Sequence, residues 1–326
     1  MTHKGDTIYD LIIIGAGPIG LATGIEAKKA GLSYIILEKG VLVNAIYSFP
    51  EQMTFFSTSN LIEIGDVPFV AHNDKPTRNE ALEYYRRVAS SWELNIQLYT
   101  EVQAMSRKDE VYTLKTSKGN AFAKAVTVST GFYDTPRMLG VPGEDLPKVK
   151  HFYDSPHPYV GQELVVVGAA NSACDVALET YYKGAKVTMV IRGEKIYEKT
   201  KYWIKPNIEN RIKEGSITAY FESAVKRITK DAVHISTPDG ERVLPNDFVL
   251  AMIGYKPNYA LFKKLGLPIA DDDAQTPIHD TDTLETPLPN VYVAGVINAG
   301  LNTSKLFIEN TRQHAPIIIA DIVAKS

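Results

Sequence analysis

The stretch YDLIIIGAGPIGLATGIEAKKAGLSYIILEKG, residues 9–40, decides the fold of the first part of the chain. Residues 11–14 form a continuous apolar run, which is typical of a strand buried on both faces. Gly15, Gly17 and Gly20 follow at GxGxxG spacing. The first glycine permits a tight turn, the second lets the backbone approach a pyrophosphate, and the third lets the helix pack on the strand. This order predicts a Rossmann-like dinucleotide-binding unit.

The residues around these glycines indicate which ligand the unit accepts. Pro18 and Ile19 stand at the start of the helix, where free N–H groups and the helix dipole favour phosphate. The next strand ends at Glu38, followed by Lys39. A carboxylate at this place accepts hydrogen bonds from ribose hydroxyls and repels a 2′-phosphate. The alternative interpretation is a crossover that binds no phosphate.

A second fingerprint, ELVVVGAANSACDVALE, begins at residue 163, and Gly168, Ala170 and Ala173 occupy its three glycine positions. Alanine at the third position is a common variant. Alanine at the second displaces a pyrophosphate outward, so we expect weaker and more exchangeable binding. The following strand ends at Arg192 instead of an acid. An arginine suits a 2′-phosphate, so NADPH is favoured over NADH, and the alternative is a solvated surface arginine.

Two such fingerprints in 326 residues indicate two domains of the α/β class. Both are expected to be Rossmann-like, three-layer domains that bind FAD or NAD(P), with the second inserted in the first. We expect the first domain to comprise residues 1–133 and 247–326, and the second to comprise residues 134–246.

Small-residue turns at strand ends mark the remainder of the first domain. One apolar strand leads to Thr130 and Gly131, and another closes on Gly295. A final helix is expected from about Thr303, with a bend at Pro316 because proline disrupts a helix interior.

Composition excludes several classes of function. The net charge of -3 gives no reason to expect nucleic acid or an anionic membrane as a partner. No apolar run approaches the ~20 residues of a transmembrane helix, and the first ten residues lack the apolar region of a secretory signal. One cysteine cannot form an internal disulfide, which favours a reducing cytoplasm. The seven histidines lack HxxxH or HExxH spacing, so we expect no metal.

Longer stretches resemble a known family. They are MTFFSTSNLIEIGDVPF (53–69), EALEYYRRV (80–88), LPKVKHFYDSPHPY (146–159), AMIGYKPNY (251–259) and LFIEN (306–310). With the fingerprints, they make the chain similar to the bacillithiol disulfide reductase family, within the flavoproteins of thioredoxin-reductase type that have two dinucleotide-binding domains. The resemblance covers nearly the whole chain. It implies FAD in the first site, NADPH in the second, and a homo-oligomer, most often a dimer.

The resemblance also implies site residues. Phe55 to Ser57 match a segment near the isoalloxazine, and Gly295 with the start of the last helix matches a second motif whose backbone amides meet the flavin. The implied FAD set is Gly15, Gly17, Pro18, Ile19, Gly20, Glu38, Lys39, Phe55, Phe56, Ser57, Thr130, Gly131, Gly295, Asn302 and Thr303. The implied NADPH set is Gly168, Ala170, Asn171, Ser172, Ala173 and Arg192.

Two departures bear on the reaction. Thioredoxin reductases carry a CxxC before the first strand of the NADPH domain, where this chain has HFYDSPHPYVGQE. Many members of the similar family have a flavin-facing cysteine where this chain has Ile19. We expect hydride transfer from NADPH to FAD, with a low-molecular-weight disulfide as the first candidate acceptor. The alternatives are a ferredoxin or flavodoxin reductase, a flavin-containing monooxygenase, and a flavin-dependent sensor without enzymatic activity.

Four side chains are weighed individually. Cys174 follows Ala173 in an apolar helix, which favours a small buried side chain over a redox centre. His151 and His157 are weak candidates for a proton donor, and packing or surface roles are the alternative. Trp203 either flanks a nicotinamide pocket or packs under a loop.

Overall fold

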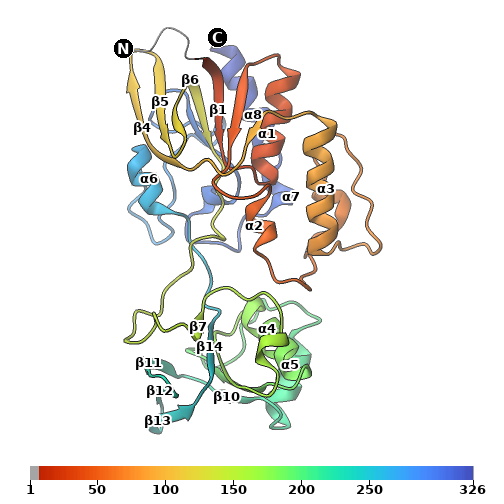
Figure 1. Cartoon of the computed structure of the whole chain (residues 1–326), viewed down its shortest axis with the longest axis vertical. Coiled ribbons are helices and arrows are strands. Elements are labelled where there is room, and N and C mark those ends of the chain that lie inside the picture. Colours follow the sequence, from red (N-terminus) through yellow and green to blue (C-terminus); the bar gives the residue numbers. More distant parts are fainter. Residues whose placement is uncertain (1–6, 326) are drawn as a thin grey trace. The chain divides into compact units, whose positions relative to one another are not determined.

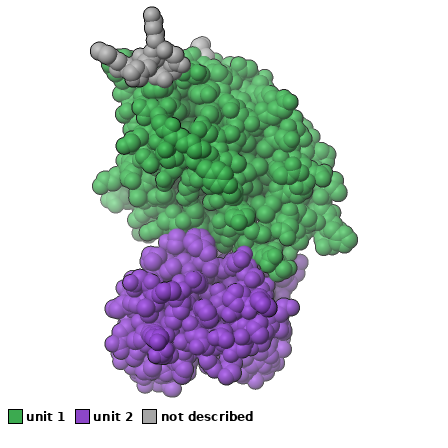
Figure 2. All heavy atoms as spheres, in the orientation of Figure 1, with its two compact units in different colours: residues 1–135, 256–326 green, residues 136–255 purple. Residues whose placement is uncertain are grey.

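The structure, a computed structural model, describes residues 7–325 and divides into two compact units. Unit 1 comprises residues 1–135 and 256–326, and unit 2 comprises residues 136–255 (Figure 2). The predicted α/β class with two Rossmann-like sheets is confirmed. Among the described residues, no helix has the length and apolar character needed to cross a membrane. Residues 1–6, on which the expectation about a secretory signal partly rests, lie outside the described residues.

Unit 1 is built on a seven-stranded sheet in the order β3-β2-β1-β6-β5-β4, with β15 also paired to β6. Figure 1 labels β1, β6, β5 and β4 of this sheet. The strands are β1 (Ile8–Ile14), β2 (Tyr34–Leu37), β3 (Ile96–Gln97), β4 (Val102–Lys108), β5 (Val111–Thr116), β6 (Gly119–Val128) and β15 (Val291–Val293). Strands β3, β2, β1, β6 and β15 are parallel, whereas β5 is antiparallel to β4 and β6. Because Ile14 and Val293 both pair with Val128, the carboxyl ends of β1, β6 and β15 meet at one edge of the sheet.

Helices cover both faces of this sheet. They are α1 (Pro18–Lys29), α2 (Asn44–Tyr47), α3 (Arg78–Ser91), α6 (Tyr259–Leu265), α7 (Ile308–Thr311) and α8 (His314–Ala324), with short 3-10 turns η1 (Ser59–Leu61) and η3 (Gly295–Ala299). Ile13 packs in one core with α1, α3 and α8, whereas Ile12 packs in the other core with Phe262 of α6. Alternate side chains of β1 thus enter two cores, which explains its unbroken apolar run.

Unit 2 holds a five-stranded parallel sheet in the order β10-β9-β8-β14-β7. The strands are β7 (Val149–Lys150), β8 (Glu163–Val167), β9 (Lys186–Val190), β10 (Thr218–Tyr220) and β14 (Phe248–Ala251). Helices α4 (Asn171–Tyr182) and α5 (Lys205–Lys213) pack on one face, and η2 (His157–Tyr159) precedes β8. The other face packs on an antiparallel sheet of β11 (Ala224–Ile228), β12 (Ala232–Thr237) and β13 (Gly240–Pro245). Unit 2 is therefore three-layered, with a sheet as its third layer.

The boundaries between the units differ from those expected. The chain leaves unit 1 after residue 135 and returns to it at residue 256, not at 247. The reason is β14, which pairs with β8 and β7 and so belongs to the sheet of unit 2. The local sequence of an apolar strand does not specify which sheet receives it.

The last helix also differs from expectation. The helix expected from about Thr303 is two helices, α7 from Ile308 and α8 from His314, which residues 312–313 separate. Pro316 lies in the first turn of α8, where its missing N–H breaks no intrahelical hydrogen bond. The discontinuity therefore precedes the proline instead of arising at it.

Candidate functional site

Backbone conformation distinguishes the glycines of the first fingerprint. Gly15 has φ of +106°, and a Cβ there would lie 2.8 Å from the carbonyl oxygen of Ser129. A Cβ on Gly20 would lie 1.9 Å from the Gly15 carbonyl oxygen. Gly17 has φ of −73°, and apart from its neighbours in the chain no described atom lies within 4 Å of a Cβ built on it. The fold itself requires Gly15 and Gly20, whereas Gly17 borders open space.

That open space lies at the N-terminus of α1. Gly17 is the N-cap, and no side chain caps the helix there. The N–H groups of Ile19 and Gly20, in the first turn, therefore have no intrahelical partner. Exposed helix N–H groups and the helix dipole favour a phosphate. The turn thus fits the pyrophosphate of FAD.

Glu38 lies beside this turn as a nearly buried carboxylate, 6% exposed. Its Oε2 accepts a hydrogen bond from Ala16 N at 2.9 Å, and its Oε1 accepts one from Gly40 N at 2.8 Å. Burial raises the pKa of the Glu38 carboxyl, and these two hydrogen bonds act in the opposite direction. Each oxygen keeps further acceptor capacity, which suits ribose hydroxyls. Lys39 forms an ion pair with Asp134.

Phe55 and Ser57 are buried, whereas the side chain of Phe56 between them is exposed. Phe55 N donates to Pro76 O at 2.9 Å, so the segment pairs with the chain just before α3. The Lys75 ammonium lies 4.9 Å from the centroid of the Phe56 ring. The segment therefore presents one ring at the surface of unit 1, with the Lys75 ammonium beside it.

The carboxyl end of β6 contributes Thr130 and Gly131. Ser129 N donates to Ile14 O at 2.9 Å, and its hydroxyl donates to Gly15 O at 3.2 Å, so this end adjoins the first glycine turn. Gly131 has φ of +65°. The Thr130 hydroxyl is buried and has no hydrogen-bond partner within residues 7–325.

The second predicted FAD motif departs from expectation. Gly295 has φ of +86°, and a Cβ there would lie 3.3 Å from Cγ1 of Ile19, so the two turns touch. The Gly295 N–H donates to Nδ1 of His314 at 3.1 Å, and this amide is therefore already engaged. Asn302 and Thr303 lie in turns before α7, where Asn302 N donates to the Ala299 carbonyl at 3.0 Å. They do not begin a helix.

The second fingerprint repeats the first in unit 2. Gly168 has φ of +131°, and a Cβ there would lie 2.6 Å from Met252 O. Ala170 is the N-cap of α4, which no side chain caps. Asn171 Oδ1 accepts a hydrogen bond from Lys201 N at 2.8 Å. The N-terminus of α4 is thus available for a phosphate. The loop at Lys201 is held to the first residue of this helix by the hydrogen bond to Asn171.

The remaining predicted NADPH residues flank this turn. Ser172 is exposed in the first turn of α4, and Ala173 is buried behind it. Arg192 is exposed just beyond β9. Arg192 thus places a solvent-accessible cation at the end of the strand that follows the fingerprint. A 2′-phosphate site requires a cation at this place.

Cys174 is fully buried, as predicted, and its Sγ lies 3.5 Å from Ala169 O. Burial raises the pKa of the thiol to about 12, and the charges of Asp175 and Glu209 add to the effect. A thiolate is the reactive form of cysteine, so this thiol is unreactive at neutral pH.

Cys174→Ala is therefore expected to leave flavin reduction and acceptor reduction nearly unchanged. It should lower the free energy of unfolding by about 1 kcal/mol, because it removes a buried sulfur. Steady-state turnover, single-turnover flavin reduction and urea unfolding measure the three quantities. Loss of disulfide turnover with flavin reduction preserved would instead make Cys174 the catalytic thiol.

The weak candidates lie in unit 2 and gain little support. The Nε2 of His151 lies 3.5 Å from Oε1 of Glu144, and both ring nitrogens are buried. His157 is exposed at the start of η2. The Trp203 side chain is exposed, and the Lys201 ammonium lies 5.5 Å from the centroid of its ring.

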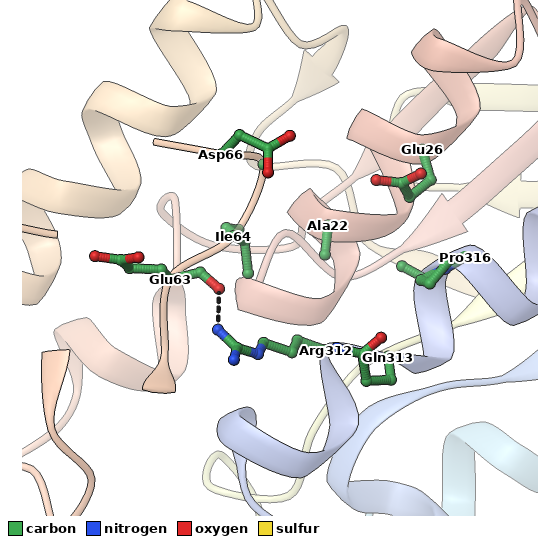
Figure 3. A pocket seen from close by; sticks show the side chains of 10 residues that line it. Ala22, Glu26, Glu63, Ile64, Asp66, Arg312, Gln313 and Pro316 are labelled. Atoms are coloured by element: carbon green, nitrogen blue, oxygen red, sulfur yellow. Dashed lines mark hydrogen bonds between the residues drawn. The ribbon is translucent and has the colours of Figure 1, made fainter. Parts of the chain in front are cut away.

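A pocket of about 270 Å³ opens elsewhere in unit 1 (Figure 3). It lies between α1, the loop at residues 63–66 and the start of α8, and charged side chains such as Glu26 and Arg312 line it. None of the sequence-predicted site residues borders it. Within residues 7–325, no group of three or more potential metal ligands is brought together.

Sequence reasoning missed the polar side chains behind the Gly295 turn, which are His279, Asn298 and His314. Only the tertiary fold brings them together, so no spacing in the sequence could have indicated them.

Comparison with known proteins places this geometry in a family. A family model described as pyridine nucleotide-disulphide oxidoreductase matches residues 12–295. Bacilliredoxin reductase Bdr of Bacillus subtilis (strain 168) is 40% identical over 316 residues, which cover 96% of this chain and 97% of that protein.

Two solved structures are similar over almost their full length. Bacillithiol disulfide reductase Bdr (YpdA) from Staphylococcus aureus has a TM-score of 0.95 and 39% identity, covering 98% of this chain and 99% of that chain. The enzyme of the same name from Bacillus cereus has a TM-score of 0.95 and 38% identity, covering 98% and 100%. The chain therefore belongs to the pyridine nucleotide-disulphide oxidoreductase family, which confirms the predicted oxidoreductase class and its FAD and NADPH cofactors.

Proposed function

We propose that this chain is an NADPH-dependent reductase of a low-molecular-weight disulfide, with bacillithiol disulfide as the first substrate to test. The balanced reaction consumes one NADPH, one proton and one disulfide, and it yields NADP⁺ and two thiols. The observation that carries the proposal is the buried Glu38 beside the open Gly17 turn, in a chain 40% identical to a bacilliredoxin reductase.

When bound, FAD supplies electron transfer between a nicotinamide and the acceptor, and the protein supplies binding and orientation. In unit 1, the α1 N-terminus would bind the pyrophosphate and Glu38 the ribose. In unit 2, the α4 N-terminus would bind the NADPH pyrophosphate, and Arg192 would bind the 2′-phosphate. These assignments follow from the free helix N-termini at Gly17 and Ala170.

The chain's own thiol takes no part in this proposal. Cys174 is buried with a pKa of about 12, and the resemblance implies that Ile19 stands where many members of the family have a flavin-facing cysteine. The reducing equivalents therefore cannot be held as a protein dithiol, and the disulfide has to be reduced without a protein thiolate.

The purified chain is expected to be yellow and to contain noncovalent FAD. Anaerobic NADPH should bleach the flavin absorbance, and bacillithiol disulfide should restore it in a stopped-flow experiment. Oxidised bacilliredoxin, ferredoxin and oxygen are tested in turn under the same conditions.

The outcomes separate the candidate functions. A colourless chain that takes up no FAD on reconstitution contradicts the proposal, because every step of the proposed reaction needs bound FAD. Bound flavin that NADPH does not bleach indicates a sensor. Reoxidation by ferredoxin or oxygen, but not by disulfides, indicates a ferredoxin reductase or a monooxygenase.

Assembly as a homodimer and a cytoplasmic location belong to the same proposal. The family resemblance supports the first, and a single cysteine, unable to form an internal disulfide, supports the second. Light scattering of the FAD-loaded chain measures the assembly state, and a monomeric mass would contradict the first part.

A further inference from the structure

A polar cluster lies behind the Gly295 turn of unit 1. The Gly295 N–H donates to Nδ1 of His314 at 3.1 Å. Asn298, 8% exposed, donates through Nδ2 to Val293 O at 3.0 Å, and the same Nδ2 lies 3.4 Å from Nε2 of His279. The turn that follows β15 is therefore fixed by side-chain hydrogen bonds as well as by the strand.

The imidazole of His314 is neutral at physiological pH. Burial lowers its pKa to about 4, and the nearby His279 adds to the effect. Its position as the first residue of α8 also disfavours a cation, because the helix dipole is positive there. With Nδ1 accepting from Gly295, the ring proton resides on Nε2.

The location of His314 is itself fixed. Two residues earlier, Arg312 Nη1 donates to Glu63 O at 2.9 Å (Figure 3). It also donates to Asn60 O at 3.2 Å, and the two hydrogen bonds hold the junction between α7 and α8 against the loop at residues 60–63. The imidazole is thus a rigid acceptor aimed at one amide.

That amide matters because its turn touches the first fingerprint. Gly295 holds φ of +86°, and the site of its missing Cβ is 3.3 Å from Ile19, in the first turn of α1. A rotation of the Gly295 peptide would displace the turn against the helix end that is shaped for a pyrophosphate. A hydrogen bond to a buried N–H is costly to remove, because the donor is left unsatisfied.

We propose that His314 is a positioning residue of the FAD site, which holds the Gly295 turn in the shape that α1 requires. This inference rests on the proposed function, since it concerns the same cofactor. It assigns a role to a side chain that no fingerprint contains.

The test compares His314→Leu, which removes the acceptor, with His314→Asn, whose Oδ1 replaces Nδ1 as an acceptor. The affinity of each apoprotein for FAD is measured by quenching of flavin fluorescence, beside urea unfolding of the apoprotein. We expect His314→Leu to weaken FAD binding by about tenfold or more and His314→Asn to restore most of it.

Ile318→Ala is the matched control, because Ile318 is fully buried one turn further along α8. It should lower the stability of the apoprotein and leave FAD affinity within about threefold of the native value, since it changes packing only. Native affinity in His314→Leu, or an Asn variant no better than Leu, would overturn the proposal.

A pH series removes the same acceptor without relying on the Leu variant. The native chain should lose FAD affinity more steeply than His314→Asn as the pH falls towards 4, because a protonated imidazole cannot accept from Gly295, whereas protonation of Glu38 weakens binding in both proteins alike. Identical pH profiles would overturn the inference. Failure of the native chain to bind FAD at any pH would instead contradict the proposed function.

Discussion

Gly17→Glu is expected to yield a folded chain that retains no FAD. The backbone at Gly17 has φ of −73°, which any residue adopts, and apart from its neighbours in the chain no described atom lies within 4 Å of the new Cβ. The new carboxylate would occupy the helix N-terminus that a pyrophosphate needs, and it would repel that anion. Flavin absorbance after gel filtration measures retention, and circular dichroism with thermal unfolding checks the fold.

Two further substitutions serve as comparisons for the loss of FAD in Gly17→Glu. Gly17→Ala adds only a methyl group and should weaken FAD binding without abolishing it. Gly20→Ala should instead impair folding, because its Cβ would lie 1.9 Å from the Gly15 carbonyl oxygen. Full flavin content in Gly17→Glu would show that the pyrophosphate binds elsewhere.

Arg192→Glu should abolish the preference for NADPH over NADH. A charge-assisted contact to the 2′-phosphate would become a repulsion, so kcat/KM with NADPH should fall by about a hundredfold or more, while that with NADH changes little. Steady-state kinetics with both coenzymes measure the ratio.

Lys195→Glu is the matched control for this charge reversal. Lys195 is also an exposed cation after β9, but it pairs with Glu198. We expect Lys195→Glu to change kcat/KM by the same factor with NADPH and with NADH. Equal losses with NADPH and NADH in Arg192→Glu would show that Arg192 does not bind the 2′-phosphate.

The sequence predicts most structural features that depend on residues close together in the chain. The strand, glycine turn and helix order at residues 9–40 specifies its own conformation, since φ of +106° at Gly15 and the contact at Gly20 follow from close packing. The burial of Cys174 follows equally from its apolar helix. Each of these features depends on residues close together in the chain.

The errors share one physical cause, which is tertiary placement. The apolar run at 248–251 reads as a strand, but only pairing with β8 and β7 assigns it to unit 2. Likewise, a helix is expected from about Thr303, whereas α7 begins at Ile308 and the Gly295 N–H donates to a histidine nineteen residues later. No local pattern encodes a hydrogen bond across that separation.

The pairing of β15 with the carboxyl end of β6 has a consequence for biosynthesis. Unit 2 is a continuous segment, so all its strands are synthesised before residues 256–326 of unit 1. Until then, the nascent sheet of unit 1 keeps an unpaired strand edge beside residues 126–128, a place where partially folded chains aggregate. Unit 2 can therefore fold first, whereas unit 1 cannot complete its sheet until β15 has been made. We expect chaperones that act during translation to bind unit 1 more than unit 2.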